Sequence, residues 1–147
     1  MTVEQISRDA AHAAAVLAKS VEVALQGAEL SPSQYRLLVY LSDEPAAATA
    51  LADKLAVTRP SLTALVDGLA ARGFVVRTTD PVDRRRVTHE ISPAGLAAVA
   101  TADALIQERL GRWLGSHLDP DDVATVNRGL ELWLAALRAA RATQGAS

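Results

Sequence analysis

The segment 80–86, Asp-Pro-Val-Asp-Arg-Arg-Arg, most constrains how this chain can fold. It carries three consecutive arginines and lies between two β-like segments, residues 74–78 and 86–91, and in the second of these apolar-facing and polar residues alternate. Three guanidinium groups cannot all be buried and paired in one turn, so the sequence predicts an exposed, basic hairpin tip. Such a tip fits a narrow anionic groove, such as the minor groove of DNA. A solvated turn with excess charge is the alternative interpretation.

Residues 47–73, just before this hairpin, have the pattern of a short helix, a tight turn and a longer helix. The longer helix carries the i, i+3, i+4, i+7 apolar spacing at Leu62, Leu65, Val66 and Leu69. Thr58 is placed to cap this helix, Pro60 is tolerated in its first turn, and Gly73 follows its last apolar residue as a stop signal. A helix–turn–helix followed by a basic hairpin is a winged helix, and the hairpin is its wing.

The outward side of the longer helix and the wing supply the candidate DNA contacts. Short hydroxyl side chains and an arginine at a helix N-terminus suit phosphate groups and base edges in a major groove. The predicted DNA-binding residues are Thr58, Arg59, Ser61, Thr63, Arg77, Arg84, Arg85 and Arg86. Asp83 is expected to pair with one neighbouring arginine and so to fix the turn of the wing.

The order of short motifs over about residues 30 to 97 resembles the MarR family of winged-helix transcriptional regulators. The motifs are Leu30-Ser31-Pro32-Ser33-Gln34-Tyr35, Val57-Thr58-Arg59, Gly73-Phe74-Val75, Asp83-Arg84-Arg85 and Ile91-Ser92-Pro93-Ala94-Gly95. Members of that family often carry basic residues where this chain has Ala64 and Gly68. Because this chain lacks basic residues at these two positions, we expect Arg59 and the wing to carry more of the DNA binding.

The charge distribution agrees with this location. The chain of 147 residues has a formal net charge of −2, which by itself does not suggest DNA binding. Residues 58–90, however, hold six basic and four acidic residues, so positive charge is concentrated on the predicted helix and wing.

The absence of cysteine excludes disulfides, thiolate metal sites and cysteine redox switching within this chain. With no apolar run of membrane-spanning length and no basic start typical of a signal peptide, we expect a cytoplasmic protein.

The remaining segments predict long helices on either side of the winged helix. Apolar residues recur at helical spacing from Ile6 onward, and helix-start signals occur at Ser31-Pro32, Ser92-Pro93 and Asp119-Pro120. The predicted fold is mainly α (α+β), with a DNA-binding domain at 30–92. The helices of 1–29 and 93–147 would form a dimerisation region. Their apolar faces favour a symmetric homodimer, as the resemblance also implies, and a monomeric helical bundle is the alternative.

A few polar residues on the helices invite functional interpretations. MarR-like folds hold small aromatic or phenolic effectors in a cleft beside the dimerisation helices, and by this analogy His12, Tyr35 and Arg36 are the expected ligand contacts. The alternative places Tyr35 in the core and Arg36 on the surface. Asp103 interrupts an apolar face, where it could pair with an arginine at the dimer interface or line the cleft. Trp113 and Trp133 fit core or dimer packing better than ligand stacking.

The sequence therefore predicts a dimeric winged-helix transcriptional regulator, a repressor that responds to a ligand and binds an inverted-repeat operator in double-stranded DNA. No cofactor or metal is expected, because no histidine pair has metal-ligand spacing. An enzyme is one alternative, but the sequence shows no nucleophile–base set, phosphate-binding loop or metal cluster. A winged-helix protein-interaction module with weak or no DNA binding is the other alternative, and it is motivated by Ala64 and Gly68.

Overall fold

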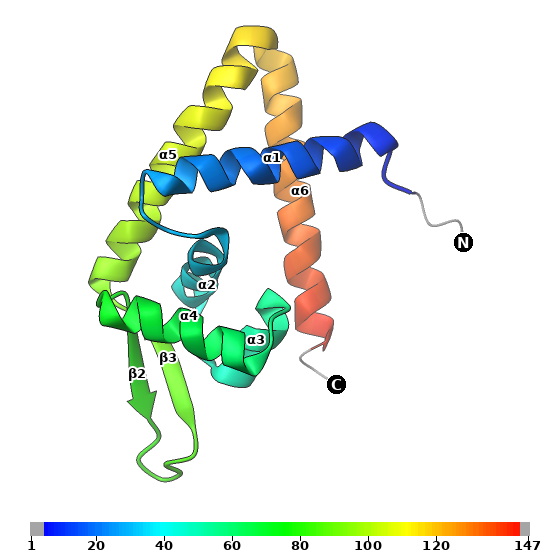
Figure 1. Ribbon diagram of the computed structural model, residues 1–147. Coiled ribbons are helices and arrows are strands. Elements are labelled where there is room, and N and C mark those ends of the chain that lie inside the picture. The colour runs from blue at the N-terminus through cyan, green and yellow to red at the C-terminus, as the bar shows by residue number, and fades with distance from the viewer. Residues whose placement is uncertain (1–4, 145–147) are drawn as a thin grey trace. The chain divides into compact units, whose positions relative to one another are not determined.

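The computed structural model describes residues 5–144, and the chain forms two compact units that meet between Arg109 and Leu110. The first unit holds all three strands and most of the helices. Its elements are α1 (Arg8–Gln26), α2 (Pro32–Asp43), β1 (Ala46–Ala47), α3 (Ala48–Leu55), α4 (Arg59–Ala71), β2 (Val75–Thr79), β3 (Val87–Ile91) and the start of α5 (Pro93–His117). Figure 1 shows these helices with strands β2 and β3. The second unit contains the end of α5 and all of α6 (Pro120–Gln144). The predicted domain boundaries at 29 and 93 stay a prediction.

Capping side chains begin most of these helices, as the sequence predicted. Ser31 and Gln34 form a full capping box, in which each side chain accepts a hydrogen bond from the other residue's backbone amide at 3.1 and 2.9 Å. Thr58 caps α4 by accepting from the amide of Ser61 at 3.2 Å. The prediction for the first helix was wrong at its start: Ile6 lies before α1, whose N-cap is Ser7.

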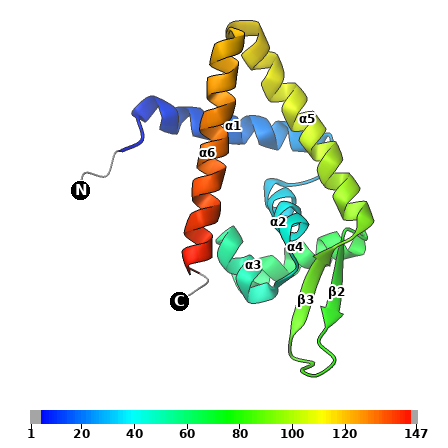
Figure 2. The same ribbon diagram turned by 180° about the vertical axis from the view of Figure 1, so that it is seen from behind.

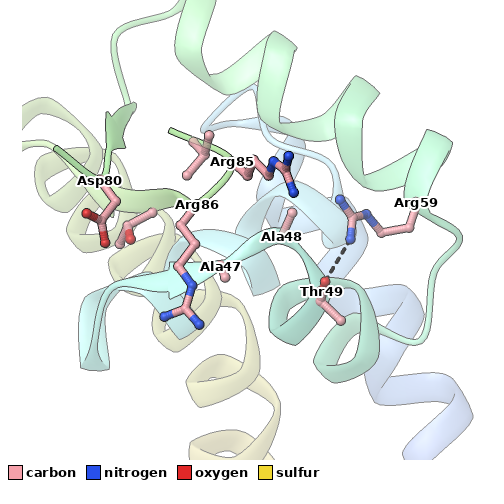
Figure 3. Close-up of a pocket in the computed structure, with 9 residues that line it drawn as sticks. Ala47, Ala48, Thr49, Arg59, Asp80, Arg85 and Arg86 are labelled. Carbon is pink, nitrogen blue, oxygen red and sulfur yellow. Dashed lines mark hydrogen bonds between the residues drawn. The ribbon is translucent and has the colours of Figure 1, made fainter. Parts of the chain in front are cut away.

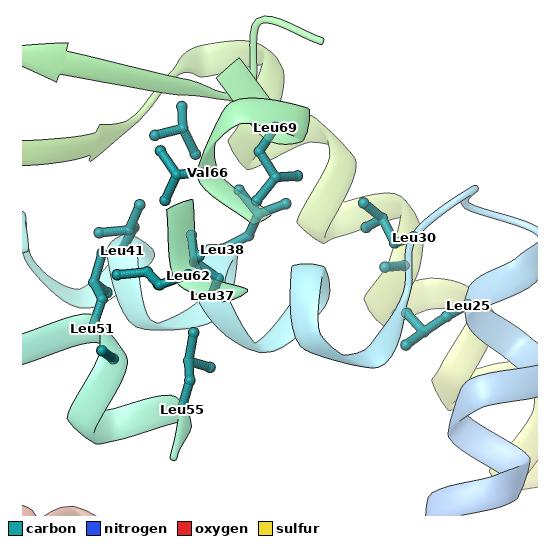
Figure 4. Packing of buried hydrophobic residues seen from close by; sticks show 13 residues of the cluster. Leu25, Leu30, Leu37, Leu38, Leu41, Leu51, Leu55, Leu62, Val66 and Leu69 are labelled. Atoms are coloured by element: carbon teal, nitrogen blue, oxygen red, sulfur yellow. The ribbon is translucent and has the colours of Figure 1, made fainter. Parts of the chain in front are cut away.

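Leucines from α2, α3 and α4 form the core of the first unit (Figure 4). Leu37, Leu38, Leu51 and Leu69 are completely buried, and Leu25 of α1 and Ala102 of α5 belong to the same cluster. Full burial of one such leucine contributes about 1.5–3 kcal/mol to stability. The helix–turn–helix is therefore held by apolar packing that leaves its polar residues outside.

The three strands form an antiparallel sheet in the order β1-β3-β2. Strands β2 and β3 form the predicted hairpin, paired from Val75 with Ile91 to Thr79 with Val87, and it projects beyond the helices of this unit (Figure 2). Strand β1 was not predicted. It is two residues long and pairs Ala46 with His89 of β3, so it attaches the wing to the start of α3.

The start of α5 is packed directly against the base of the wing. Ser92 accepts a hydrogen bond from the amide of Gly95 at 3.0 Å and donates one to the carbonyl oxygen of Gly73 at 2.5 Å. A Cβ at Gly95 would collide with the carbonyl oxygen of Phe74 and lie 2.7 Å from Cγ1 of Ile91. Only glycine fits this close approach, which fixes where the hairpin leaves the unit.

The second unit exposes large apolar side chains. Trp113 is 45% exposed, and on α6 the set with at least 45% exposure is Leu130, Leu132, Trp133, Leu134 and Leu137. No residue of α6 whose side chain the structure describes is buried. Trp113 and Trp133 are therefore not core residues within one chain, and the other interpretation, packing between two copies, stays a prediction. Within residues 5–144, no helix is both long and apolar enough to cross a membrane.

Candidate nucleic-acid interface

The N-terminal turn of α4 joins the two helices of the helix–turn–helix through polar side chains. The Nη1 of Arg59 donates a hydrogen bond of 2.7 Å to the hydroxyl of Thr49 on α3. The hydroxyl of Thr58 donates to the hydroxyl of Ser61 at 2.9 Å, and Ser61 keeps its own proton as a possible donor. All four side chains lie on exposed residues, so this turn offers hydroxyl groups and one guanidinium to solvent.

Carboxylates fix the turn of the wing by binding backbone amides. Oδ1 of Asp80 accepts hydrogen bonds from the amides of Val82 and Asp83 at 2.8 and 3.2 Å, and these bonds hold the pKa of the Asp80 carboxyl below its usual value. Oδ1 of Asp83 accepts from the amide of Arg85 at 3.1 Å. The backbone of Asp80 and Arg86 closes the loop with a hydrogen bond of 2.9 Å.

The predicted role of Asp83 is therefore corrected in its mechanism. Asp83 helps to fix the turn, but among residues 5–144 it forms no ion pair with a neighbouring arginine. Asp side chains at turns commonly accept a hydrogen bond from the backbone amide two residues ahead, as Asp83 does here. Asp80, which the sequence reasoning did not select, makes two such bonds, and its position before Pro81 is a turn signal that could have identified it.

A cavity of about 480 Å³ lies where α3, α4 and the wing meet (Figure 3). Arg59 reaches it from α4, and Arg85 and Arg86 reach it from the wing. Its full lining is Ala47, Ala48, Thr49, Arg59, Asp80, Arg85, Arg86, Val87 and Thr88. The N-cap of α3, Ala47, offers no side-chain hydrogen bond, and the first amides of a helix carry partial positive charge. Three guanidinium groups, a helix start and the single carboxylate of Asp80 thus line one concave surface, whose net positive charge favours anions.

The other predicted DNA contacts lie outside this cavity. Arg77 on β2 forms an ion pair with Asp67 on α4, so it links the wing to the longer helix of the helix–turn–helix. Arg84 is exposed at the tip of the wing. The hydroxyl of Thr63 donates to the carbonyl oxygen of Arg59 at 3.0 Å, within its own helix. The Asp67 partner of Arg77 lies ten residues away on another element, which no local sequence pattern signals.

His89 is a buried polar residue beneath this surface. The residue is only 5% exposed, and Nδ1 lies 3.1 Å from the carbonyl oxygen of Ala46. Burial lowers the pKa of His89, and the charges of Arg77 and Arg59 lower it further, while the contact with Ala46 opposes them. The ring is therefore held neutral next to the basic surface, where it connects β3 to β1.

Comparison with known proteins identifies the family. A model of the MarR family matches residues 28–86, which are the winged helix up to the wing tip. An uncharacterised HTH-type transcriptional regulator from Mycobacterium leprae is 34% identical over 115 residues, which cover 78% of each chain. The chain belongs to the MarR family.

Solved structures show how far the likeness extends. Wild-type MarR from E. coli in its apo form superposes with a TM-score of 0.76 at 22% identity, covering 91% of this chain and 99% of that one. The transcriptional repressor CouR, solved bound to a 23-mer DNA duplex, superposes with a TM-score of 0.69 at 27% identity, covering 87% of this chain and 92% of that one. The chain spans between 49% and 64% of the length of the first curated relatives that it matches.

Each of the three predicted ligand contacts of this MarR-family chain has its own surroundings in the structure, and their role in ligand binding stays a prediction. The phenol of Tyr35 donates a hydrogen bond of 2.5 Å to Asp103 on α5, and the pKa of Tyr35 is raised by burial and by that carboxylate. Arg36 is exposed and donates to Ser33 on its own helix at 3.3 Å. His12 is exposed on α1. Within the chain Asp103 accepts this hydrogen bond from Tyr35, and its two interpretations, an arginine pair at the dimer interface or a place in the lining of the cleft, stay predictions.

No metal site appears in the part of the chain that the structure describes, since it contains no group of three His, Cys, Asp or Glu side chains suited to a metal ion. The matching family and the relative from Mycobacterium leprae are regulators rather than enzymes.

Proposed function

We propose that this chain is a sequence-specific DNA-binding repressor that acts as a homodimer on an inverted-repeat operator in double-stranded DNA. The observation that carries the proposal is the basic cavity, where Arg59 of the helix–turn–helix and Arg85 and Arg86 of the wing face the same space. A surface of this kind suits a sugar–phosphate backbone that passes from a major groove to the next minor groove. The DNA complex of CouR, a repressor with the same fold, supports the assignment.

In this proposal the residues have distinct roles. Arg59, Arg85 and Arg86 bind backbone phosphates, and Arg84 enters the minor groove at the wing tip. Thr58 and Ser61 orient the start of α4 over the major groove. Arg77 acts through Asp67 to hold the wing beside α4 rather than as a primary phosphate ligand.

The dimer in this proposal is supported by the second unit. Apolar side chains such as Trp133 and Leu137 are about half exposed on α6, and burial between two copies would remove them from water. Two copies related by a twofold axis place two α4 helices on successive major grooves of one duplex face. The half-sites of the operator would then lie roughly 34–36 Å apart.

The proposal is tested by selection of bound duplexes from a random-sequence library, followed by salt-dependent gel-shift titration. Replacement of Arg84 and Arg85 by alanine should abolish specific binding and leave the fold intact, as judged by circular dichroism. Residual binding should show a slope of log K against log salt that is flatter by about 0.9 for each lost phosphate contact. Arg8→Ala with Lys19→Ala, the matched control on α1, removes the same charge and should bind normally.

Two results would contradict the proposal. If the library yields no enriched sequence, the protein-interaction module becomes the better description. If the Arg84 and Arg85 double variant binds like the control, the wing has been assigned wrongly.

A ligand-responsive mechanism is a second part of the proposal, and it rests on the family resemblance. A small aromatic or phenolic effector would contact Tyr35 and Arg36, with His12 as a further polar group. Because Tyr35 already bonds to Asp103, such a ligand would have to displace or share this hydrogen bond. A screen of small aromatic acids and phenols for thermal stabilisation tests this part, with Tyr35→Phe as the variant that should lose the response.

A further inference from the structure

The exposed side of α4 carries little charge for a helix proposed to lie in a groove of DNA. Between Arg59 and Ala71 the only ionisable residues are Arg59 and Asp67. Leu62, Val66 and Leu69 are buried, which turns Thr63, Ala64 and Asp67 outward. This helix must therefore read bases through groups other than unpaired arginine or lysine side chains.

Both charges of α4 already have partners. At the N-terminal end of α4, Arg59 donates a hydrogen bond of 2.7 Å to the hydroxyl of Thr49 on α3. Asp67 is neutralised by Arg77 of β2, towards the other end of the helix. The middle of the exposed side lies between these two tethered charges and consists of Thr63 and Ala64.

The chemistry of these two side chains is narrow. Ala64 presents only a methyl group. The hydroxyl proton of Thr63 is donated to the carbonyl oxygen of Arg59, so this side chain can offer DNA a methyl group and hydroxyl lone pairs but no free proton. Bidentate readout of guanine uses Arg or Lys, and that of adenine uses Asn or Gln; none of these types occurs between Pro60 and Ala71.

We propose that the middle of α4 selects its operator through thymine 5-methyl groups, which Thr63 and Ala64 contact in the major groove. In the major groove only thymine among the four bases carries this methyl group, and Ala and Thr methyl groups are suited to it. The inference rests on the proposed DNA-binding function and names the feature of the half-site that this function reads. It assigns specificity to Thr63 and Ala64 and affinity to the arginines of the cavity and wing.

The experiment uses the duplex that library selection yields, with thymines replaced one at a time by uracil, which lacks only the 5-methyl group. Burial of one carbon of this size changes affinity by about fourfold. We expect one or two positions in each half-site to lose about that factor in gel-shift titrations with the full chain. Thymines under the wing serve as internal controls, because the 5-methyl group points into the major groove and the wing is proposed to enter the minor groove. If every uracil is tolerated, the proposal is wrong.

A protein variant assigns the contact to its residue. Thr63→Ser removes the methyl group and keeps the hydroxyl that bonds to the helix backbone. It should weaken binding to the thymine duplex by about fourfold and reduce the penalty for uracil at its contacted position, since one methyl–methyl contact cannot be lost twice. Ala64→Gly should do the same at a neighbouring position.

Thr101→Ser on α5 is the matched control. Its hydroxyl makes the same kind of hydrogen bond, to the carbonyl oxygen of Ala97 at 3.1 Å, and it lies outside the proposed interface. Thr101→Ser should leave the affinity for the thymine duplex and for the uracil-substituted duplexes unchanged. If replacing thymine by uracil still weakens binding by the full factor in both Thr63→Ser and Ala64→Gly, other residues must contact the methyl groups. Selection of no sequence at all would instead overturn the proposed DNA-binding function, so the two failures are distinguishable.

Discussion

The phenol of Tyr35 and the carboxylate of Asp103 form a hydrogen bond of 2.5 Å that joins α2 to α5. Both residues are partly buried, and the pKa of Tyr35 is raised, first by burial and then by Asp103. The contact has two effects. It satisfies a carboxylate on an otherwise apolar helix face, and it holds the phenol in its protonated form.

Tyr35→Phe removes this donor and leaves Asp103 without it. Removal of a partner from a partly buried polar group costs about 1–3 kcal/mol, and we expect the lower end because both side chains keep some contact with water. Urea unfolding at pH 8 measures this cost. Asp103→Ala in the same assay should give a similar loss, because it breaks the same bond from the other side.

Alkaline pH separates this contact from a general packing effect. Because the folded-state pKa of Tyr35 is raised, the unfolded chain loses its proton first, above about pH 10. The stabilising contribution of the protonated phenol is complete below that pH and is lost as pH rises. The wild-type chain should therefore lose more stability between pH 9 and 11 than Tyr35→Phe, with Tyr40→Phe as control. Equal losses in wild type and Tyr35→Phe would refute the assignment.

At the scale of elements, the sheet shows what the sequence can and cannot predict. The wing hairpin, the helix–turn–helix and the caps at Ser31 and Thr58 were predicted because their signals are local: alternation, helical spacing and short polar residues before a helix. Strand β1 has no such signal, because two alanines become a strand only by pairing with β3. The partners Asp67 of Arg77 and Thr49 of Arg59 were missed for the same reason, since each lies ten residues from its arginine on another element.

His89 connects β1 to β3, so its titration should affect how the wing is attached. Its folded-state pKa is lowered, mainly by burial, so the neutral ring is the form that the fold accepts. The unfolded chain takes up a proton near pH 6.5 while the folded chain resists it, and stability is therefore lost as pH falls below about 6.5.

We expect the unfolding temperature of the wild-type chain to drop between pH 7 and pH 5, and to drop less in His89→Gln. Glutamine keeps a donor for the carbonyl oxygen of Ala46 and cannot ionise. His117→Gln, which changes an exposed histidine near the end of α5, is the matched control and should behave as wild type. Thermal melts followed by circular dichroism give the comparison, and an unchanged acid response in His89→Gln would count against this role.

At the scale of the whole molecule, the distribution of charge matters more for DNA binding than the net charge. The chain has a net charge of −2, yet Arg59, Arg85 and Arg86 face one cavity. Acidic residues elsewhere oppose non-specific attraction to a polyanion, while the local cluster favours it. The affinity for DNA should consequently depend strongly on having two such clusters on one duplex, which is a property of the dimer and not of one chain.

This dependence leads to a prediction about assembly. Trp133 is 50% exposed on α6 and belongs to the set of exposed apolar residues on this helix. Trp133→Glu would place a charge in the proposed interface between copies, where an unpaired charge is strongly unfavourable. We expect this variant to sediment as a monomer at concentrations at which we expect the wild-type chain to sediment as a dimer.

Asn127→Glu adds the same charge to an exposed polar position of α6 and is the matched control, which should stay dimeric. The Trp133→Glu monomer should also lose affinity for the full inverted repeat and bind it no better than a duplex with one half-site, because the two helices α4 are no longer linked. Deletion from Asp119 onward should expose the remaining apolar surface and cause aggregation or unfolding. A folded monomer, from either change, that still binds the full operator with wild-type affinity would show that one chain is sufficient and that the exposed side chains of α6 have another partner.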